Sequence, residues 1–325
     1  MNITVIGCGR WGSLITWYLD SIGHTVTLYG RSTSAHMQRF LKERRNSLLE
    51  LPASVRLTTD IRGATASEIV VISINSQSLQ SLCQELNACG IKNKTVVLCM
   101  KGIEISTGRR LSQIAAQTLD GSNRIAVWLG PGHVQDFYSG IPNCMVIDSD
   151  CRETKEFLVK NFSSNLIRFY YGQDLIGNEV GAATKNVIGI AAGMLDGANL
   201  STLKGPLMSR GTHEISRLIK AMGGNELSAY GLCHLGDYEA TVFSTYSHNR
   251  KFGENFILGK PYDSLAEGYY TAEALMFLAE KYNVELPICT GVYNILYKGR
   301  KPEEVLNSLF ERKLKKEFYF FDSEE

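Results

Sequence analysis

The chain has 325 residues, of which 44% are apolar and 21% charged, and its formal net charge at pH 7 is +1. This length predicts two domains, because single hydrophobic cores stop growing near about 250–300 residues. The near-zero net charge offers no field for nucleic acid or an anionic membrane, and no apolar stretch approaches the roughly 20 residues that span a bilayer.

The chain begins with a strand, a glycine-rich turn, a helix and a second strand. Residues 2–6 are β-rich and run directly into Gly7-Cys8-Gly9-Arg10-Trp11-Gly12. A helical pattern of apolar residues follows over 14–19, and residues 25–29 make the second strand. In this context the Gly-x-Gly-x-x-Gly spacing predicts a dinucleotide-binding loop.

Each glycine of this loop has a separate task. Gly7 permits the tight turn, Gly9 lets the backbone approach a pyrophosphate, and Gly12 allows close packing of helix on strand. The N-terminus of the helix then presents free N–H groups and a positive dipole end to the phosphates.

Arg31 follows the second strand at the position that selects the cofactor. An NAD-selective site usually carries Asp or Glu there for the ribose hydroxyls, whereas an arginine suits the 2′-phosphate of NADP. An ordinary surface arginine would give the same sequence. We therefore expect NAD or NADP as cofactor and leave the preference between them open.

Further strands alternate with helices. Strand patterns over 68–74, 95–100 and 124–129 are separated by helical stretches over 77–87 and 108–118. This alternation predicts a mainly parallel sheet with helices on both faces.

Ligands of such sheets bind beyond the carboxyl ends of the strands. The strand ends carry Asn75-Ser76, Lys101-Gly102 and Gly130-Pro131-Gly132. Lys101 is the one charged residue among them, and we expect it to face the nicotinamide end of the cleft rather than to be a solvated loop lysine.

The strand pattern fades near residue 174. Helical periodicity appears at 209–222, 271–282 and 302–317. We therefore expect an α/β protein with an N-terminal Rossmann-like, mainly parallel sheet domain over 1–174. An all-α C-terminal domain that contributes to substrate binding and catalysis would occupy 175–325. The acidic, aromatic end at 318–325 is predicted to be a terminal flap or disordered.

Lys185 lies in a run of small and apolar residues over 181–193. In a helix, neighbours three and four positions away share a face, and none of those neighbours is able to pair with an ammonium. Such a face normally packs against protein, so Lys185 is predicted to be partly desolvated, with a lowered pKa that suits acid–base work. The alternative is a lysine that snorkels to solvent from the edge of the helix.

Two polar clusters follow in the second half. One is 231–237, in which Asp237 stands one helical turn before Thr241; its bland interpretation is a helix N-cap. The other is 247–253, with His248, Asn249 and Arg250, which is either an anion clamp or a solvated polar turn. Together with Lys185 they supply an acid, a carboxylate that orients it and donors for a phosphate, which predicts hydride transfer to a carbonyl of a small phosphorylated substrate.

The eight cysteines form no Cys-x-x-Cys pair, and no histidine stands at metal-ligand spacing beside them. No basic segment precedes the first apolar run, as it would in a signal peptide. We therefore expect a cytoplasmic enzyme with reduced cysteines and no metal.

The chain resembles the NAD(P)-dependent glycerol-3-phosphate dehydrogenases over nearly its full length. The resemblance depends on several separate motifs in the right order. They are Gly7-Cys8-Gly9-Arg10-Trp11-Gly12, Lys101-Gly102-Ile103-Glu104, Thr107-Gly108-Arg109, Lys185-Asn186-Val187-Ile188, Leu235-Gly236-Asp237, Asn249-Arg250, Phe252-Gly253, Ala266-Glu267-Gly268 and Glu285-Leu286-Pro287-Ile288.

This resemblance implies reduction of dihydroxyacetone phosphate to sn-glycerol 3-phosphate for phospholipid synthesis. Lys185 would donate the proton to the developing alkoxide, Lys101 would position the substrate, and Asp237 would hold the Lys185 ammonium. The implied substrate contacts are Lys101, Gly130, Asn186, Thr241, His248, Asn249 and Arg250. The implied cofactor contacts are Gly7, Gly9, Arg10, Trp11, Gly12, Arg31, Lys101, Val134, Arg250 and Glu267.

Two departures from the family pattern concern the substrate's phosphate end. The family usually has Arg where this chain has His248, and Gly-Pro-Ser-Phe-Ala where this chain has Gly130-Pro131-Gly132-His133-Val134. A histidine has fewer donors than a guanidinium and is only partly charged near neutrality. Phosphate affinity is therefore expected to fall, to depend on pH, or to shift to Arg250, Lys251 or Lys204.

These departures leave two alternatives open. One is a related reductase of the same architecture that acts on another short keto or hydroxy acid, and the other is a nucleotide-binding sensor without catalysis. The sequence does not determine the oligomeric state, for which a homodimer is the candidate.

Overall fold

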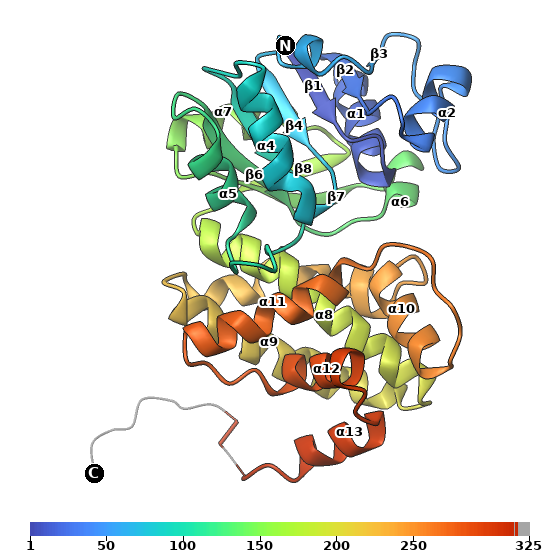
Figure 1. Ribbon diagram of the computed structural model, residues 1–325, viewed down its shortest axis with the longest axis vertical. Helices are drawn as coiled ribbons and strands as arrows, with labels where there is room; N and C mark the ends of the chain where they lie inside the picture. The colour runs from blue at the N-terminus through green and yellow to red at the C-terminus, as the bar shows by residue number, and fades with distance from the viewer. Residues whose placement is uncertain (315, 318–325) are drawn as a thin grey trace.

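The computed structural model describes residues 1–314, 316 and 317. Figure 1 shows two parts stacked along the long axis, a sheet with its helices above and a group of helices below. The segment 318–325, for which a flap or disorder is predicted, lies outside the described residues, and no described helix is long and apolar enough to cross a membrane.

One eight-stranded sheet organises the first part, in the order β3-β2-β1-β4-β5-β6-β7-β8. The strands from β1 to β6 pair in parallel, whereas β7 pairs antiparallel with β6 and parallel with β8. Their bounds are β1 (Asn2–Ile6), β2 (Thr25–Tyr29), β3 (Arg56–Thr58), β4 (Ile69–Ile72), β5 (Thr95–Leu98), β6 (Arg124–Leu129), β7 (Asn143–Asp148) and β8 (Ile167–Tyr171).

Helices cover both faces of this sheet. The helices of the first part are α1 (Arg10–Ser21), α2 (Ala35–Glu43), α3 (Ile61–Ala64), α4 (Leu79–Ala88), α5 (Leu111–Thr118), α6 (Val134–Tyr138) and α7 (Arg152–Phe162). Side chains of α1, α2, α6 and α7 pack on one face, and those of α4 and α5 on the other. Because successive strand residues point to opposite faces, burial on both faces requires the unbroken apolar runs that the sequence shows.

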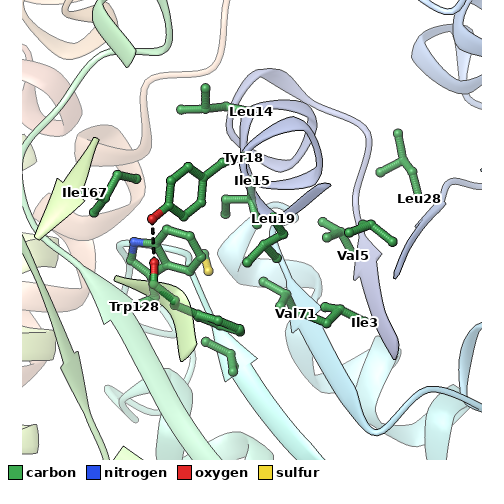
Figure 2. Close-up of a cluster of buried hydrophobic side chains, with 14 of the residues drawn as sticks. Ile3, Val5, Leu14, Ile15, Tyr18, Leu19, Leu28, Val71, Trp128 and Ile167 are labelled. Atoms are coloured by element: carbon green, nitrogen blue, oxygen red, sulfur yellow. Dashed lines mark hydrogen bonds between the residues drawn. The ribbon is translucent and has the colours of Figure 1, made fainter. Parts of the chain in front are cut away.

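Figure 2 shows part of the core on the α1 face, where Tyr18 of α1 lies near Trp128 of β6. The two rings meet edge to face at 5.9 Å, and the Tyr18 hydroxyl donates to the carbonyl of Phe162 and is hydrogen-bonded to the Ser164 hydroxyl. This aromatic contact ties the dinucleotide-loop helix to the antiparallel end of the sheet.

A long helix, α8 (Leu175–Gly197), organises the second part. Its partners include α9 (Lys204–Ala221), α10 (His248–Ile257) and α11 (Glu267–Lys281), followed by α12 (Pro287–Lys298) and α13 (Pro302–Phe310). The small residues of α8 permit close approach: a Cβ on Gly193 would lie 1.9 Å from the Arg250 carbonyl oxygen. The apolar face around Lys185 is therefore covered by other helices.

The five strands predicted from the sequence are present, but β3, β7 and β8 were not predicted. The helix expected over 302–317 is wrong at its C-terminal end, since α13 stops at Phe310. Leu314 is 101% exposed, so it has no packing partner among the described residues that would stabilise further turns. Packing of an apolar face, more than intrinsic propensity, stabilises most protein helices.

Candidate active site

Lys185 lies in the middle of α8 with its side chain only 8% exposed, so the snorkelling interpretation is wrong. Its Nζ donates to Asp237 Oδ2 at 2.7 Å and to Thr241 Oγ1 at 2.7 Å. Burial lowers the pKa of Lys185 to about 8; Asp237 opposes that shift, and the nearby Lys101 adds to it. Lys185 is thus placed to release a proton near neutral pH.

Lys101 follows β5 and reaches the same carboxylate. Its Nζ donates to Asp237 Oδ2 at 2.8 Å and to the Gly130 carbonyl at 2.6 Å, with 18% of the side chain exposed. An ammonium has three N–H donors, so one donor remains on Lys101 and one on Lys185 after these bonds. Both remaining donors are available to an oxygen of a bound molecule.

Asp237 is the centre of this group. It ends a short 3-10 helix, η4 (Leu235–Asp237), and is 1% exposed, with Oδ2 shared by the two lysines. The N-cap interpretation is therefore wrong. The other oxygen, Oδ1, is buried and has no hydrogen-bond partner among the described residues.

A π-helix, η5 (Glu239–Phe243), follows Asp237 and carries Thr241. The Thr241 hydroxyl donates to the Asp237 carbonyl at 2.7 Å and accepts from Lys185. Such π-turns are rare and are frequent at functional sites, where they redirect side chains.

An amide relay joins four elements beside the lysines. Asn186 donates to the Lys101 carbonyl at 3.3 Å, and Asn249 donates to Asn186 at 3.0 Å. Asn249 also accepts from the backbone N–H of Gly268 at 2.9 Å. The relay fixes the end of β5 relative to α8, α10 and α11.

A cleft of about 760 Å³ lies at the carboxyl edge of the sheet, where the strand order reverses between β1 and β4. Its lining includes Gly7, Gly9, Arg10 and Trp11. A Cβ on Gly7 would lie 2.0 Å from the Ser73 carbonyl, whereas a Cβ on Gly9 would meet no atom within 4 Å. Gly9 thus leaves open space at the N-terminus of α1, which fits the approach of a pyrophosphate.

Gly12 contacts the turn itself and does not line the cleft: a Cβ there would lie 1.9 Å from the Gly7 carbonyl oxygen. Its role in this chain is the close packing of α1 on the turn.

Arg31 lines the far end of the cleft together with Thr33, Ser34 and His36, three residues that sequence reasoning missed. The sequence feature that could have identified them is a group of polar residues directly after β2. Lys101 and Glu267 line the other end. Burial raises the pKa of Glu267 to about 7, against the opposing charge of Lys101.

His248 is hydrogen-bonded to Arg10 through Nε2 and to the Tyr262 hydroxyl through Nδ1 at 2.6 Å. Burial, followed by the positive charges of Arg10 and Lys251, lowers the pKa of His248 below its usual value. This shift further disfavours the charged imidazole, which the sequence already predicts to be only partly charged near neutrality.

Arg250 is turned into an ion-pair cluster. Its Nε donates to Asp196 Oδ2 at 2.6 Å, and Lys204 donates to the same oxygen at 2.6 Å. Two of the three cations considered as replacements for the missing phosphate arginine, Arg250 and Lys204, are thus already neutralised in part.

Gly132 and His133 follow β6 at the site. Gly132 has φ +140°, and a Cβ there would lie 2.2 Å from Phe137 Cε2, so the serine of the family pattern does not fit this loop. His133 Nε2 is buried without a hydrogen-bond partner among the described residues. Burial lowers the pKa of His133, and the charges that act on it include Lys185 and Asp237.

The sequence analysis noted that Gly132 replaces the serine of the family pattern, but it did not propose His133 as a site residue. The position of His133 shortly after the end of a strand could have indicated it. Val134, expected at the cofactor, has its side chain in the apolar core on the α1 face.

The chain matches known proteins in sequence and in structure. A family model described as NAD-dependent glycerol-3-phosphate dehydrogenase N-terminus matches residues 2–155, and the corresponding C-terminus model matches residues 174–307. Glycerol-3-phosphate dehydrogenase, NAD(P)+, from Thermoanaerobacter sp. (strain X514) is 33% identical over 331 residues, covering 98% of this chain and 99% of that protein. A protein named glycerol-3-phosphate dehydrogenase, NAD(P)+, 2 from Salinibacter ruber (strain DSM 13855 / M31) is 32% identical over 333 residues, covering 98% of this chain and 96% of that protein. The crystal structure of glycerol-3-phosphate dehydrogenase from Coxiella burnetii matches with a TM-score of 0.89 at 25% identity, covering 96% of this chain and 99% of that one.

Proposed function

The chain belongs to the NAD-dependent glycerol-3-phosphate dehydrogenase family, and on that premise we propose that it reduces dihydroxyacetone phosphate to sn-glycerol 3-phosphate with NADH or NADPH. The observation that carries this proposal is the pair of ammoniums on one buried carboxylate, Lys101 and Lys185 on Asp237, beside the dinucleotide cleft. Each ammonium keeps one free donor for the reacting oxygen.

The charges of this group match the reaction. Two ammoniums and one carboxylate sum to +1, and hydride addition to a carbonyl carbon places a negative charge on its oxygen. Donors fixed where that charge develops stabilise the transition state more than the ground state.

The nicotinamide supplies the hydride when it is bound. Lys185 then gives one N–H proton to the alkoxide oxygen and becomes a neutral amine, and solvent restores its proton. Lys101 donates a hydrogen bond to the same oxygen. Asp237 positions both lysines and remains a carboxylate throughout.

The test is cofactor oxidation at 340 nm with dihydroxyacetone phosphate, in wild type and Lys185→Met. General acid catalysis contributes about 10²–10⁴-fold, so kcat should fall by that factor. Lys155→Met is the matched control, because Lys155 also pairs with a buried aspartate, Asp148 at 3.1 Å, outside the site. Wild type without turnover on either cofactor, or equal losses in both variants, contradicts the proposal.

A second candidate is reduction of an unphosphorylated short keto acid, favoured by the replacement of the family's arginine by His248, whose pKa is lowered by burial. A panel of three- to five-carbon phosphorylated and carboxylated substrates separates the two. Higher kcat/KM for a carboxylated substrate selects the second candidate, and tight cofactor binding without any turnover selects a sensor.

The cellular assignment extends this proposal. A supply of sn-glycerol 3-phosphate would serve phospholipid synthesis in the cytoplasm. The division into 1–174 and 175–325 is supported by the end of β8 at Tyr171 and the start of α8 at Leu175. The homodimer stays a prediction that light scattering of the purified protein decides.

A further inference from the structure

We propose that Arg10 of the dinucleotide loop binds the phosphate group of the substrate, with His248 as the residue that positions its guanidinium. The anion clamp would then have one member in each half of the chain, Arg10 on α1 and His248 on α10. This inference rests on the proposed function and specifies how its phosphorylated substrate is held.

His248 is arranged as an acceptor and not as a cation. A guanidinium has only donors, so the bond from Arg10 Nη1 requires the Nε2 lone pair of His248. The ring proton then lies on Nδ1 and is donated to Tyr262. A neutral imidazole in this tautomer orients Arg10 and supplies no charge for a phosphate.

Arg10 is a partly buried cation without a counter-charge. Over residues 1–314, 316 and 317, no carboxylate lies within salt-bridge distance of its guanidinium, whereas Arg109 pairs with Glu104 at 2.8 Å and Arg250 with Asp196 at 2.6 Å. Removing a cation from water without a partner is costly, so such a group fits a site that an anion completes.

Its donors are also largely unused. Of the five guanidinium N–H groups, one bonds His248 and one reaches Gln135 at 3.5 Å, which leaves three. Guanidinium N–H groups pair with phosphate oxygens in a planar, bidentate geometry.

The position of Arg10 relative to the reaction centre supports a substrate phosphate. His133 stands three residues after Gly130, whose carbonyl accepts from Lys101, and at the start of α6, which also carries Gln135, a partner of Arg10. Its Nε2 is buried and has no hydrogen-bond partner among the described residues. Asn249, next to His248, donates a hydrogen bond to Asn186 of α8, the helix that carries Lys185.

The cofactor pyrophosphate is the competing ligand, because Arg10 also lines the dinucleotide cleft. The backbone N–H groups at the start of α1 would serve a pyrophosphate without this side chain. The side chain extends instead to His248 of α10 and Gln135 of α6, toward the position at which the family usually has its arginine. The guanidinium missing from residue 248 is thus supplied from residue 10.

The experiment compares wild type, Arg10→Gln and the exchange variant Arg10→Gln/His248→Arg. Calorimetry of the NADH-saturated protein, in which no hydride transfer to the cofactor is possible, measures the Kd of sn-glycerol 3-phosphate, and separate titrations measure the Kd of the cofactor. Steady-state rates are measured with dihydroxyacetone phosphate and with unphosphorylated dihydroxyacetone. Arg39→Gln, which removes one exposed arginine from α2, is the charge-matched control.

A hydrogen bond to a charged group is worth about a factor of 10–100 in affinity, so Arg10→Gln should raise the Kd of sn-glycerol 3-phosphate by that factor. The cofactor Kd and kcat/KM for dihydroxyacetone should change by a smaller factor than the Kd of sn-glycerol 3-phosphate, and the exchange variant should recover most of the phosphate affinity. Arg39→Gln should match wild type, and all variants should keep the unfolding temperature of wild type within a few degrees.

Three results overturn the inference: an unchanged Kd for sn-glycerol 3-phosphate in Arg10→Gln, a cofactor Kd that rises as much as the substrate Kd, or an equal loss with dihydroxyacetone. An exchange variant without recovery in a folded protein also counts against it. Wild type that turns over no phosphorylated substrate refutes the proposed function alone, and Arg10-dependent binding of sn-glycerol 3-phosphate would still uphold the clamp.

Discussion

Asp237→Asn should move the pH profile of the reaction, because this carboxylate opposes the effect of burial on Lys185. Its Oδ2 lies 2.7 Å from Lys185 Nζ and 2.8 Å from Lys101 Nζ, with the residue 1% exposed. The asparagine removes the single negative charge between two ammoniums and keeps the size of the side chain.

The direction follows from the protonation states. Reduction needs protonated Lys185, so kcat should fall as pH rises through about 8, the value to which burial lowers the pKa of Lys185. Oxidation of sn-glycerol 3-phosphate needs the neutral amine, so its rate should rise over the same range. Both limbs report the coupled lysines together.

The magnitude follows from the lost charge-assisted bond. A hydrogen bond to a charged group contributes about 1.5–3 kcal/mol, which corresponds to roughly 1–2 pH units. In Asp237→Asn the limb should therefore shift by about that amount toward lower pH, and the rate of reduction should recover in part near pH 6.

The assay is kcat in both directions from pH 5.5 to 9.5 at saturating cofactor. Asp196→Asn is the matched control, since Asp196 also joins two cations, Lys204 and Arg250, through one oxygen. It should leave the position of the limb unchanged. A limb in Asp237→Asn that coincides with that of wild type would refute the role given to this carboxylate.

Three further predictions concern stability and the loop after β6. Gly132→Ser should destabilise the protein by about 1–3 kcal/mol, because φ is +140° and the new Cβ would lie 2.2 Å from Phe137 Cε2; equal urea midpoints for variant and wild type would contradict this. His133→Phe should raise the free energy of unfolding by about 1 kcal/mol, since a buried atom without a partner disappears, and should weaken substrate binding; a lower urea midpoint argues against it. Glu214 accepts the N–H groups of Ile288 and Cys289 at the start of α12, and burial raises its pKa to about 7. The folded state then binds the proton more tightly than the unfolded state, so this group loses stability as pH rises from about 4.5 to 7. Glu214→Gln should therefore reduce the difference between the unfolding free energies measured at pH 5 and pH 7, and an undiminished difference would exclude this assignment.

Local patterns in the sequence were sufficient for the parallel half of the sheet. Runs such as Val70-Val71-Ile72 are buried on both faces, and the glycine loop lies between a strand and a helix that follow each other directly. The strand β8 was missed because it lies at the edge of the sheet, where only Ile167 and Phe169 are buried and the other three residues are exposed. The predicted helix over 302–317 was too long because it included apolar residues such as Leu314 as if they were buried. The sequence does not show whether another element covers such a residue, and Leu314 is exposed.

The sequence by itself determined the chemistry available to this protein: a dinucleotide loop, two lysines, a carboxylate and a departure at His248. Tertiary structure decided how these groups are connected. Lys101 and Asp237 are 136 positions apart, and Arg10 and His248 are 238 apart, yet both pairs are hydrogen-bonded. The periodicity of apolar residues identifies only neighbours that are a few positions apart in the chain. The lowered pKa values of Lys185 and His248 depend instead on burial and on charged groups from distant parts of the chain. The physical reason is that desolvation and charge act through space, and the packing of α8 against β6 and of α10 on α8 brings the distant residues together.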